Sequence, residues 1–144
     1  MERELDSLDA RRARYIAIAA HIDQRDNGGK PRFQHVEYVA NRFAVIPLAI
    51  VAYLHDVLED STITTKECLA ATFGQEVADA VDAITRRKDE RYFDYIERCR
   101  QNSIARLVKI EDIKHNLDKS RWPEMPASYE ERERKALGML GVKE

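Results

Sequence analysis

The stretch PLAIVAYLHDVLED, residues 47–60, decides the fold, because an apolar segment ends in a cluster of ionisable side chains. On a helix that turns by about 100° per residue, one arc is apolar and is predicted to face the core: Ile50, Val51, Leu54, Val57 and Leu58. The opposite arc carries His55, Asp56, Glu59 and Asp60. Carboxylates this close repel one another unless a cation or a catalytic task compensates. The alternative is that Glu59 and Asp60 form a solvated helix end.

The composition around this segment fits one compact, all-α domain. The chain has 144 residues, of which 44% are hydrophobic, and it contains only 5 glycines and 4 prolines. A chain of this size buries roughly 70% of its extended surface on folding, and few glycines and prolines favour helices over a turn-rich β fold. The 24 basic and 26 acidic residues give a net charge of −2. This balance argues against nonspecific binding of a nucleic-acid polymer.

Apolar runs, the first residues and the cysteines bear on the cellular compartment in which the protein is expected. No apolar run approaches the roughly 18 residues that would span a bilayer, and residues 1–4 do not open a secretory signal. Cys68 and Cys99 are the two cysteines, and they form no CxxC motif. Free thiols of this kind are typical of a reducing cytoplasm, so we expect a cytoplasmic protein with no membrane partner.

Hydrophobic periodicity and capping residues predict helices along the whole chain. In the first helix, Leu8, Tyr15, Ile18 and Ile22 recur at helical spacing, and a later helix is predicted to bury Leu107, Ile110, Ile113 and Leu117. No segment alternates with period two. The expected helices cover residues 6–23, a segment around 36–43 that ends before Pro47, residues 47–58, a segment opened by a capping box of Thr64 and Glu67, residues 75–86, residues 92–100, a segment capped by Asn102 or Ser103, and residues of about 128–140.

Several motifs occur in an order that resembles a known family. The His55-Asp56 pair is preceded by His35 in KPRFQH, residues 30–35, and followed by Asp112 in KIEDIKHN, residues 109–116. With LHDVLEDS (54–61) and FGQEV (73–77), this order resembles the HD superfamily of metal-dependent phosphohydrolases, and within it the hydrolase domain of RelA/SpoT proteins and the small alarmone hydrolases. The resemblance covers residues of about 10–120. It implies that residues 1–144 form a single HD-type helical bundle.

The resemblance also implies a set of site residues. A single divalent ion, expected to be Mn²⁺, would be held by His35, His55, Asp56 and Asp112, a mixed imidazole and carboxylate set. Glu59 and Asp60 would then assist proton transfer. No histidine lies between Asp60 and Asp112, which favours one metal ion over the multi-metal members. We expect His21 to be an ordinary helix histidine, and for His115 we favour a surface role over a position directly behind the ligands.

Substrate contacts are expected before the first ligand histidine and after the last motif aspartate. Basic residues of that first loop, Arg25, Lys30 and Arg32, and the motif asparagine Asn116 are the predicted substrate-binding residues. Asp26 and Asp118 are acidic where the alarmone hydrolases tend to be basic. We favour a solvated helix end for the basic run at residues 85–88 over a contact with a phosphorylated ligand, and we expect Trp122 to cover the edge of the core.

Three functions remain open at this point. The first is a phosphohydrolase that acts on a small phosphorylated nucleotide, resembling a (p)ppGpp 3′-pyrophosphohydrolase. The second keeps the metal but uses nucleoside monophosphates or similar phosphomonoesters. The third is a non-catalytic, nucleotide-binding regulatory module, against which the intact set of predicted ligands argues. The sequence does not separate the two enzymatic functions, and it does not give the oligomeric state.

Overall fold

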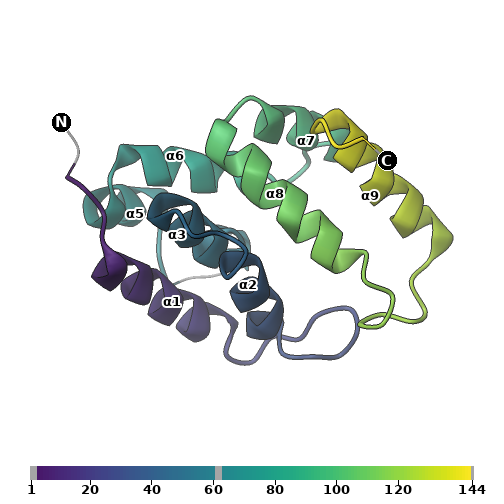
Figure 1. Cartoon of the computed structure of the whole chain (residues 1–144), viewed down its shortest axis with the longest axis horizontal. Coiled ribbons are helices and arrows are strands. Elements are labelled where there is room, and N and C mark those ends of the chain that lie inside the picture. The colour runs from purple at the N-terminus through teal and green to yellow at the C-terminus, as the bar shows by residue number, and fades with distance from the viewer. Residues whose placement is uncertain (1–2, 61–62, 144) are drawn as a thin grey trace.

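A computed structural model describes residues 3–60 and 63–143, apart from the side chain of Asp60. The described residues form nine α-helices and no strand, so the predicted all-α fold is confirmed (Figure 1). The single β pairing among them is an isolated bridge between Arg25 and Pro31. The helices are α1 (Ser7–His21), α2 (Arg32–Ala40), α3 (Ile46–Leu54), α4 (Val57–Asp60), α5 (Lys66–Phe73), α6 (Gln75–Ile84), α7 (Tyr92–Arg100), α8 (Ser103–Asn116) and α9 (Ala127–Met139).

Helix α3 lies at the centre of the molecule. Pro47 occupies its first turn, where a missing N–H leaves no helical hydrogen bond unmade. From Ile50 to Leu54 every residue is buried, and α3 packs against α1, α2, α6 and α8. Because these neighbours surround it, the residues that directly follow Leu54 emerge inside the protein.

The helix predicted over residues 47–58 is not continuous. It ends at Leu54, the chain turns at His55 and Asp56, and α4 begins at Val57. At this turn the backbone N–H of His55 and its ring Nδ1 both approach the carbonyl of Ala52, at 3.4 and 2.6 Å. A side chain that takes up a nearby backbone carbonyl competes with the helical hydrogen bond. The predicted single arc of ionisable residues is therefore divided: His55 and Asp56 lie in the turn, and Glu59 lies on α4.

Helix α1 packs through small residues. Ala13 and Ala17 are fully buried, whereas Leu8, Tyr15 and Ile22 are 50%, 65% and 75% exposed. The helix is as predicted, and Ile18 is half-buried, but the other three residues of the predicted apolar set are exposed, because alanines occupy the face of α1 that packs closely on α3. The apolar period therefore indicated the helix without indicating its buried face.

Two local predictions need correction. Thr65, one residue later than predicted, caps α5 by accepting the N–H of Cys68. In α8 the predicted cap Asn102 is confirmed, but Leu107 is 41% exposed and Val108 is buried in its place. The cap of α5 is therefore shifted by one residue, whereas in α8 the other predicted core residues, Ile110, Ile113 and Leu117, do pack in or against the core.

Two loops meet at one end of the molecule. In Figure 1 the loop between α1 and α2 runs beside the loop that links α8 to α9. Arg121 of the second loop forms an ion pair with Asp26 of the first. The same guanidinium donates to the carbonyl of His115 at 3.2 Å. The ion pair between Arg121 and Asp26 joins residues that are 95 positions apart.

Among the described residues, no helix combines the length and the apolar character that a membrane span requires.

Candidate metal and catalytic site

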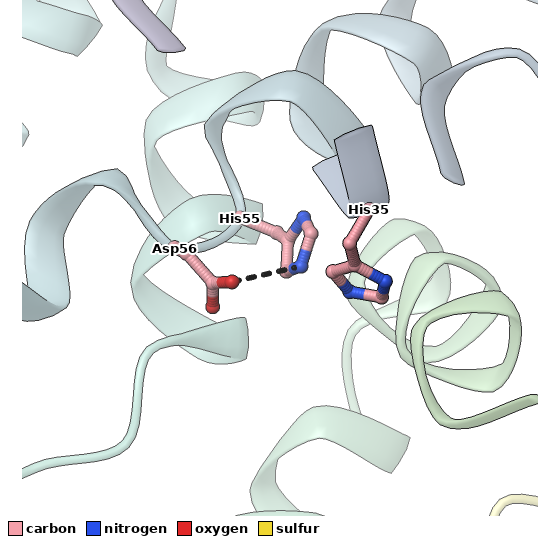
Figure 2. Close-up of side chains that lie close together, drawn as sticks. All are labelled: His35, His55 and Asp56. Carbon is pink, nitrogen blue, oxygen red and sulfur yellow. Dashed lines mark ion pairs between the residues drawn. The ribbon is translucent and has the colours of Figure 1, made fainter. Parts of the chain in front are cut away.

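Three predicted metal ligands lie together at the end of α3. His35 comes from α2, and His55 and Asp56 form the turn between α3 and α4 (Figure 2). One possible ligand atom from each of the three lies within 4.8 Å of the others. Both histidines are buried, and the Asp56 side chain is 21% exposed. The helix break therefore places an imidazole and a carboxylate next to each other at the site.

Helix α8 brings the fourth predicted ligand to the same place. Oδ1 of Asp112 lies 2.7 Å from Nε2 of His35 and 3.4 Å from Nε2 of His55. Its other oxygen, Oδ2, accepts a hydrogen bond of 2.8 Å from Nζ of Lys109. Asn116 donates to Oδ1 at 3.2 Å. The structure thus gathers all four predicted ligands, which come from three separate segments of the chain.

The His55 ring tests whether a metal ion fits. Its Nδ1 donates to the carbonyl of Ala52 at 2.6 Å, which leaves Nε2 with a lone pair in the neutral ring. That buried nitrogen makes no hydrogen bond, yet carboxylate oxygens of Asp56 and Asp112 lie 3.3 and 3.4 Å from it. A lone pair that faces two anions is unfavourable unless a cation lies among them. Two imidazoles and two carboxylates suit a divalent ion of intermediate hardness, so the donor set fits.

Without a metal ion, the charges of the site shift the pKa values of its own residues. Burial lowers the pKa of His55, but the carboxylates of Asp56 and Asp112 outweigh it and raise that pKa well above its usual value. Burial raises the pKa of Asp112, yet Lys109 and His55 hold it well below the usual range. The site therefore compensates its carboxylates with positive charge even in the metal-free chain.

A cavity of about 240 Å³ opens from this cluster. Three of the four predicted ligands line it, as does Glu59 of α4. The side chain of Asp60 lies outside the described residues. The wall of the cavity also contains four cationic side chains, from Arg32, Lys109, Arg121 and Arg132, and two aromatic rings, from Trp122 and Tyr129. A cavity with a metal-compatible base and with cationic and aromatic side chains in its wall can bind an anionic ligand that carries a ring.

The structure places two of the four predicted substrate-binding residues at the cavity and the other two outside it. Arg32 and Asn116 line the cavity, and Nη1 of Arg32 lies 3.5 Å from Oδ2 of Asp56. Arg25 and Lys30 are exposed and are not among its lining residues. Arg25 instead donates to the carbonyl of Gly29 at 2.9 Å. The basic loop therefore contributes one cation to the cavity, not three.

Residues from the C-terminal part of the chain line the cavity without having been predicted. Arg121, Tyr129 and Arg132 carry no motif, and only tertiary structure brings them to the cavity. Trp122 was expected at the edge of the core but lines the cavity. Lys109 could have been found from sequence, because it precedes Asp112 by three residues and therefore lies on the same face of α8.

The expected surface role of His115 is wrong. The residue is 9% exposed, its Nδ1 lies 2.8 Å from Nδ1 of His35, and burial lowers its pKa to about 4. Its ring also stacks on Tyr38, with centroids 3.8 Å apart. His115 follows Asp112 by three residues, the spacing that puts two side chains on one helical face, and this was the signal for its position.

Comparisons with known proteins agree with this geometry. A guanosine-3′,5′-bis(diphosphate) 3′-pyrophosphohydrolase of Vibrio cholerae is 33% identical over 131 residues, which is 86% of this chain and 18% of that protein. The Haemophilus influenzae protein of the same name is 32% identical over 117 residues, or 71% of this chain and 17% of that protein. The chain thus spans less than a fifth of the length of these relatives.

A solved structure shares the fold. It is that of a metazoan ortholog of SpoT, described as a protein that hydrolyzes ppGpp and plays a role in starvation responses. It aligns with a TM-score of 0.79 at 23% identity and covers 96% of this chain and 89% of that one. The family model described as HD domain matches residues 13–140, from α1 to the end of α9. The order of the predicted ligands in the sequence, their meeting near the α3–α4 turn and this match agree, and the chain belongs to the HD domain family.

Proposed function

We propose that this chain is a metal-dependent phosphohydrolase that acts on a small phosphorylated nucleotide. The observation that carries the proposal is the Nε2 atom of His55, a buried nitrogen that makes no hydrogen bond with the described residues and lies 3.3 and 3.4 Å from carboxylate oxygens of Asp56 and Asp112, beside a cavity with four cationic side chains in its wall. The first candidate reaction is removal of the 3′-pyrophosphate from a (p)ppGpp-like nucleotide. The names of the Vibrio and Haemophilus relatives support this choice.

We assign His35, His55, Asp56 and Asp112 as ligands of one divalent ion, and we propose Mn²⁺. Such an ion, when bound, would lower the pKa of a water molecule and polarise a phosphate oxygen. The chain's own contribution is to hold the ligands in place. Ala52 orients His55 through its carbonyl, and Lys109 holds Asp112 through its ammonium group.

We propose that Glu59 and Asp60 handle protons. Glu59 lines the cavity and follows Asp56 by three residues, so it lies near the ligands without belonging to the set. A carboxylate in that position can accept a proton from an attacking water or return one to a leaving group. Asp60 is assigned the same task because it follows Glu59 at the end of α4.

Substrate binding is proposed to rest on the cavity walls. Arg32 and Asn116 keep their predicted role, because both line the cavity. Arg121 and Arg132 add positive charge from the C-terminal part of the chain, and Trp122 and Tyr129 offer faces on which a nucleobase can stack. Arg25 and Lys30 would reach a ligand only if it extended beyond the described cavity.

One feature favours the second candidate, a phosphomonoesterase that acts on nucleoside monophosphates. With Arg25 and Lys30 outside the cavity, and with Asp26 placing a carboxylate on its wall, fewer cations are available for a highly charged nucleotide. Asp118, the other acid that departs from the alarmone hydrolases, is exposed. A substrate with one phosphate group needs no cation beyond those next to the proposed metal.

The test is hydrolysis by the purified chain with Mn²⁺ of ppGpp, of guanosine monophosphate and of a generic phosphoester. Pyrophosphate release from ppGpp that is lost in Asp112→Asn is the expected result. Turnover of the monophosphate alone would move the protein to the phosphomonoesterase. Nucleotide binding without turnover of any of the three would establish the non-catalytic module instead.

We also propose that the protein acts in the cytoplasm on a small molecule, with no nucleic-acid polymer or membrane as a partner. Cys68 and Cys99 are both free thiols, which fits a reducing compartment.

A further inference from the structure

A second histidine stands behind one of the proposed metal ligands. His35 presents Nε2 to the site, where Oδ1 of Asp112 lies 2.7 Å away. On the opposite side of the same ring, Nδ1 lies 2.8 Å from Nδ1 of His115, and the two rings are parallel within 5°. Both histidines are buried. The ring centroids are 5.0 Å apart, so the two imidazoles meet edge to edge in a hydrogen bond, with one proton between the two nitrogens.

The proposed metal site decides which nitrogen carries that proton. A histidine that ligates through Nε2 must have its lone pair there, so a neutral His35 carries its proton on Nδ1. His35 then donates, and Nδ1 of His115 must accept. His115 in turn carries its own proton on Nε2. The reverse arrangement would put the proton of His35 on Nε2, where it would displace a metal ion.

The surroundings hold His115 in this role and keep it away from the substrate. Tyr38 stacks on its ring with an interplanar angle of 9°, and Arg121 donates to its backbone carbonyl. His115 does not line the cavity at the metal ligands; it lines a separate pocket of about 200 Å³ with Tyr38 and Lys114. It therefore touches His35 and not the reacting groups.

We propose that His115 is a positioning residue that fixes His35 as a neutral ligand with Nε2 directed at the metal ion. Ligating histidines generally pass their second N–H to an outer acceptor, and loss of that acceptor typically costs 10–100-fold in metal affinity. In this chain the acceptor is another imidazole. The inference rests on the metal site of the proposed function, but it does not depend on which phosphate ester is the substrate.

The test compares His115→Phe with His115→Asn in a titration with Mn²⁺ alone, without nucleotide. Phenylalanine keeps a ring that can stack on Tyr38 but has no acceptor, whereas the Oδ1 of asparagine can take the place of Nδ1. We expect about 10–100-fold weaker Mn²⁺ binding for His115→Phe and recovery of most of the affinity in His115→Asn. Lys114→Ala, an exposed neighbour on α8, is the matched control and should bind like wild type. Thermal melting of each metal-free variant shows that it is folded.

The outcomes separate this inference from the proposed function. If His115→Phe is folded and binds Mn²⁺ as tightly as wild type, or if His115→Asn is as weak as His115→Phe, the positioning role is overturned while the metal site stands. If wild type binds no divalent ion, the metal site fails and the positioning role fails with it.

A second measurement needs no variant, and it decides the matter even if His115→Phe does not fold. Nitrogen NMR of the imidazoles in Zn²⁺-loaded wild type should show the proton on Nδ1 of His35 and on Nε2 of His115. A proton on Nδ1 of His115 would overturn the inference.

Discussion

At the scale of single residues, the site depends on a buried balance of charge around Asp112. One carboxylate oxygen faces the two histidines and the other accepts from Lys109 at 2.8 Å. Nζ of Lys109 also lies 5.1 Å from the ring centroid of Tyr95. Burial lowers the pKa of Lys109, but Asp112 and the nearby tyrosines raise it well above its usual value. Lys109 is therefore held in its charged form, and removing it would take away part of the positive charge that compensates the buried carboxylate of Asp112.

Replacing Lys109 should destabilise the metal-free protein strongly. Lys109→Met removes one partner of a buried ion pair, which typically costs about 3–5 kcal/mol; since His35, His55 and Asn116 still contact Asp112, we expect a loss of up to this size. Urea denaturation of the metal-free chain measures the change. The matched substitution Lys114→Met, on the exposed side of α8, should change stability by less than about 0.5 kcal/mol. Equal effects of the two substitutions would show that Lys109 does not balance Asp112.

Glu59 should matter for turnover and not for metal binding. Glu59→Gln keeps the size of the side chain but removes its ability to take up a proton, so we expect turnover to fall by roughly 10²–10⁴-fold with Mn²⁺ affinity unchanged. Asp60→Asn should behave in the same way. The rate on the established substrate and a Mn²⁺ titration are the two measurements. Near-wild-type turnover in both variants would identify the pair as a solvated helix end.

At the scale of elements, α7 holds the end of α6. The carbonyls that terminate a helix have no partner within it, and the guanidinium of Arg98 supplies donors to them. It donates to the carbonyls of Asp82, Ala83 and Thr85 at 3.1, 3.2 and 2.9 Å. Glu90 in the intervening loop binds the same guanidinium at 2.8 and 3.0 Å. A single half-buried arginine thus joins two helices and the loop between them.

This arrangement predicts an acid-sensitive contribution to stability. The hydrogen bonds from Arg98 lower the pKa of Glu90 from 4.5 to about 2. A carboxylate whose pKa is lower in the folded state stabilises the protein above its unfolded pKa, and this contribution is lost as the pH falls. The free energy of unfolding of wild type should therefore exceed that of Glu90→Gln above about pH 5, and the difference should shrink between about pH 4.5 and pH 2. A difference that is independent of pH would contradict the ion pair.

The elements also show which parts of the fold could be predicted. The starts of helices announced by a cap or a proline were predicted to within one residue, because Asn102 and Pro47 act on adjacent backbone groups. The break after Leu54 was not predicted, because it depends on the His55 ring reaching the carbonyl of Ala52. The exposed face of α1 was not predicted either, since it depends on how closely α3 approaches.

At the scale of the whole molecule, the cavity combines segments that are distant in sequence. The four predicted ligands follow from the family resemblance of the sequence, and the structure brings these residues close together. Arg132 on α9 has no local signal, because its place depends on the path of the loop after α8. Asp26 and Arg121 fix that path by joining the two loops. The resemblance therefore predicted which residues meet at the site, whereas the residues of the cavity walls required the tertiary fold.

The proposed metal site requires one divalent ion to join α2, the α3–α4 turn and α8. A crystal structure of the chain grown with Mn²⁺, with diffraction recorded at the manganese absorption edge, tests this most directly. We predict a single anomalous peak in contact with His35, His55, Asp56 and Asp112. No peak at this cluster, or a manganese ion bound only elsewhere on the chain, would contradict the assignment of these four residues as metal ligands.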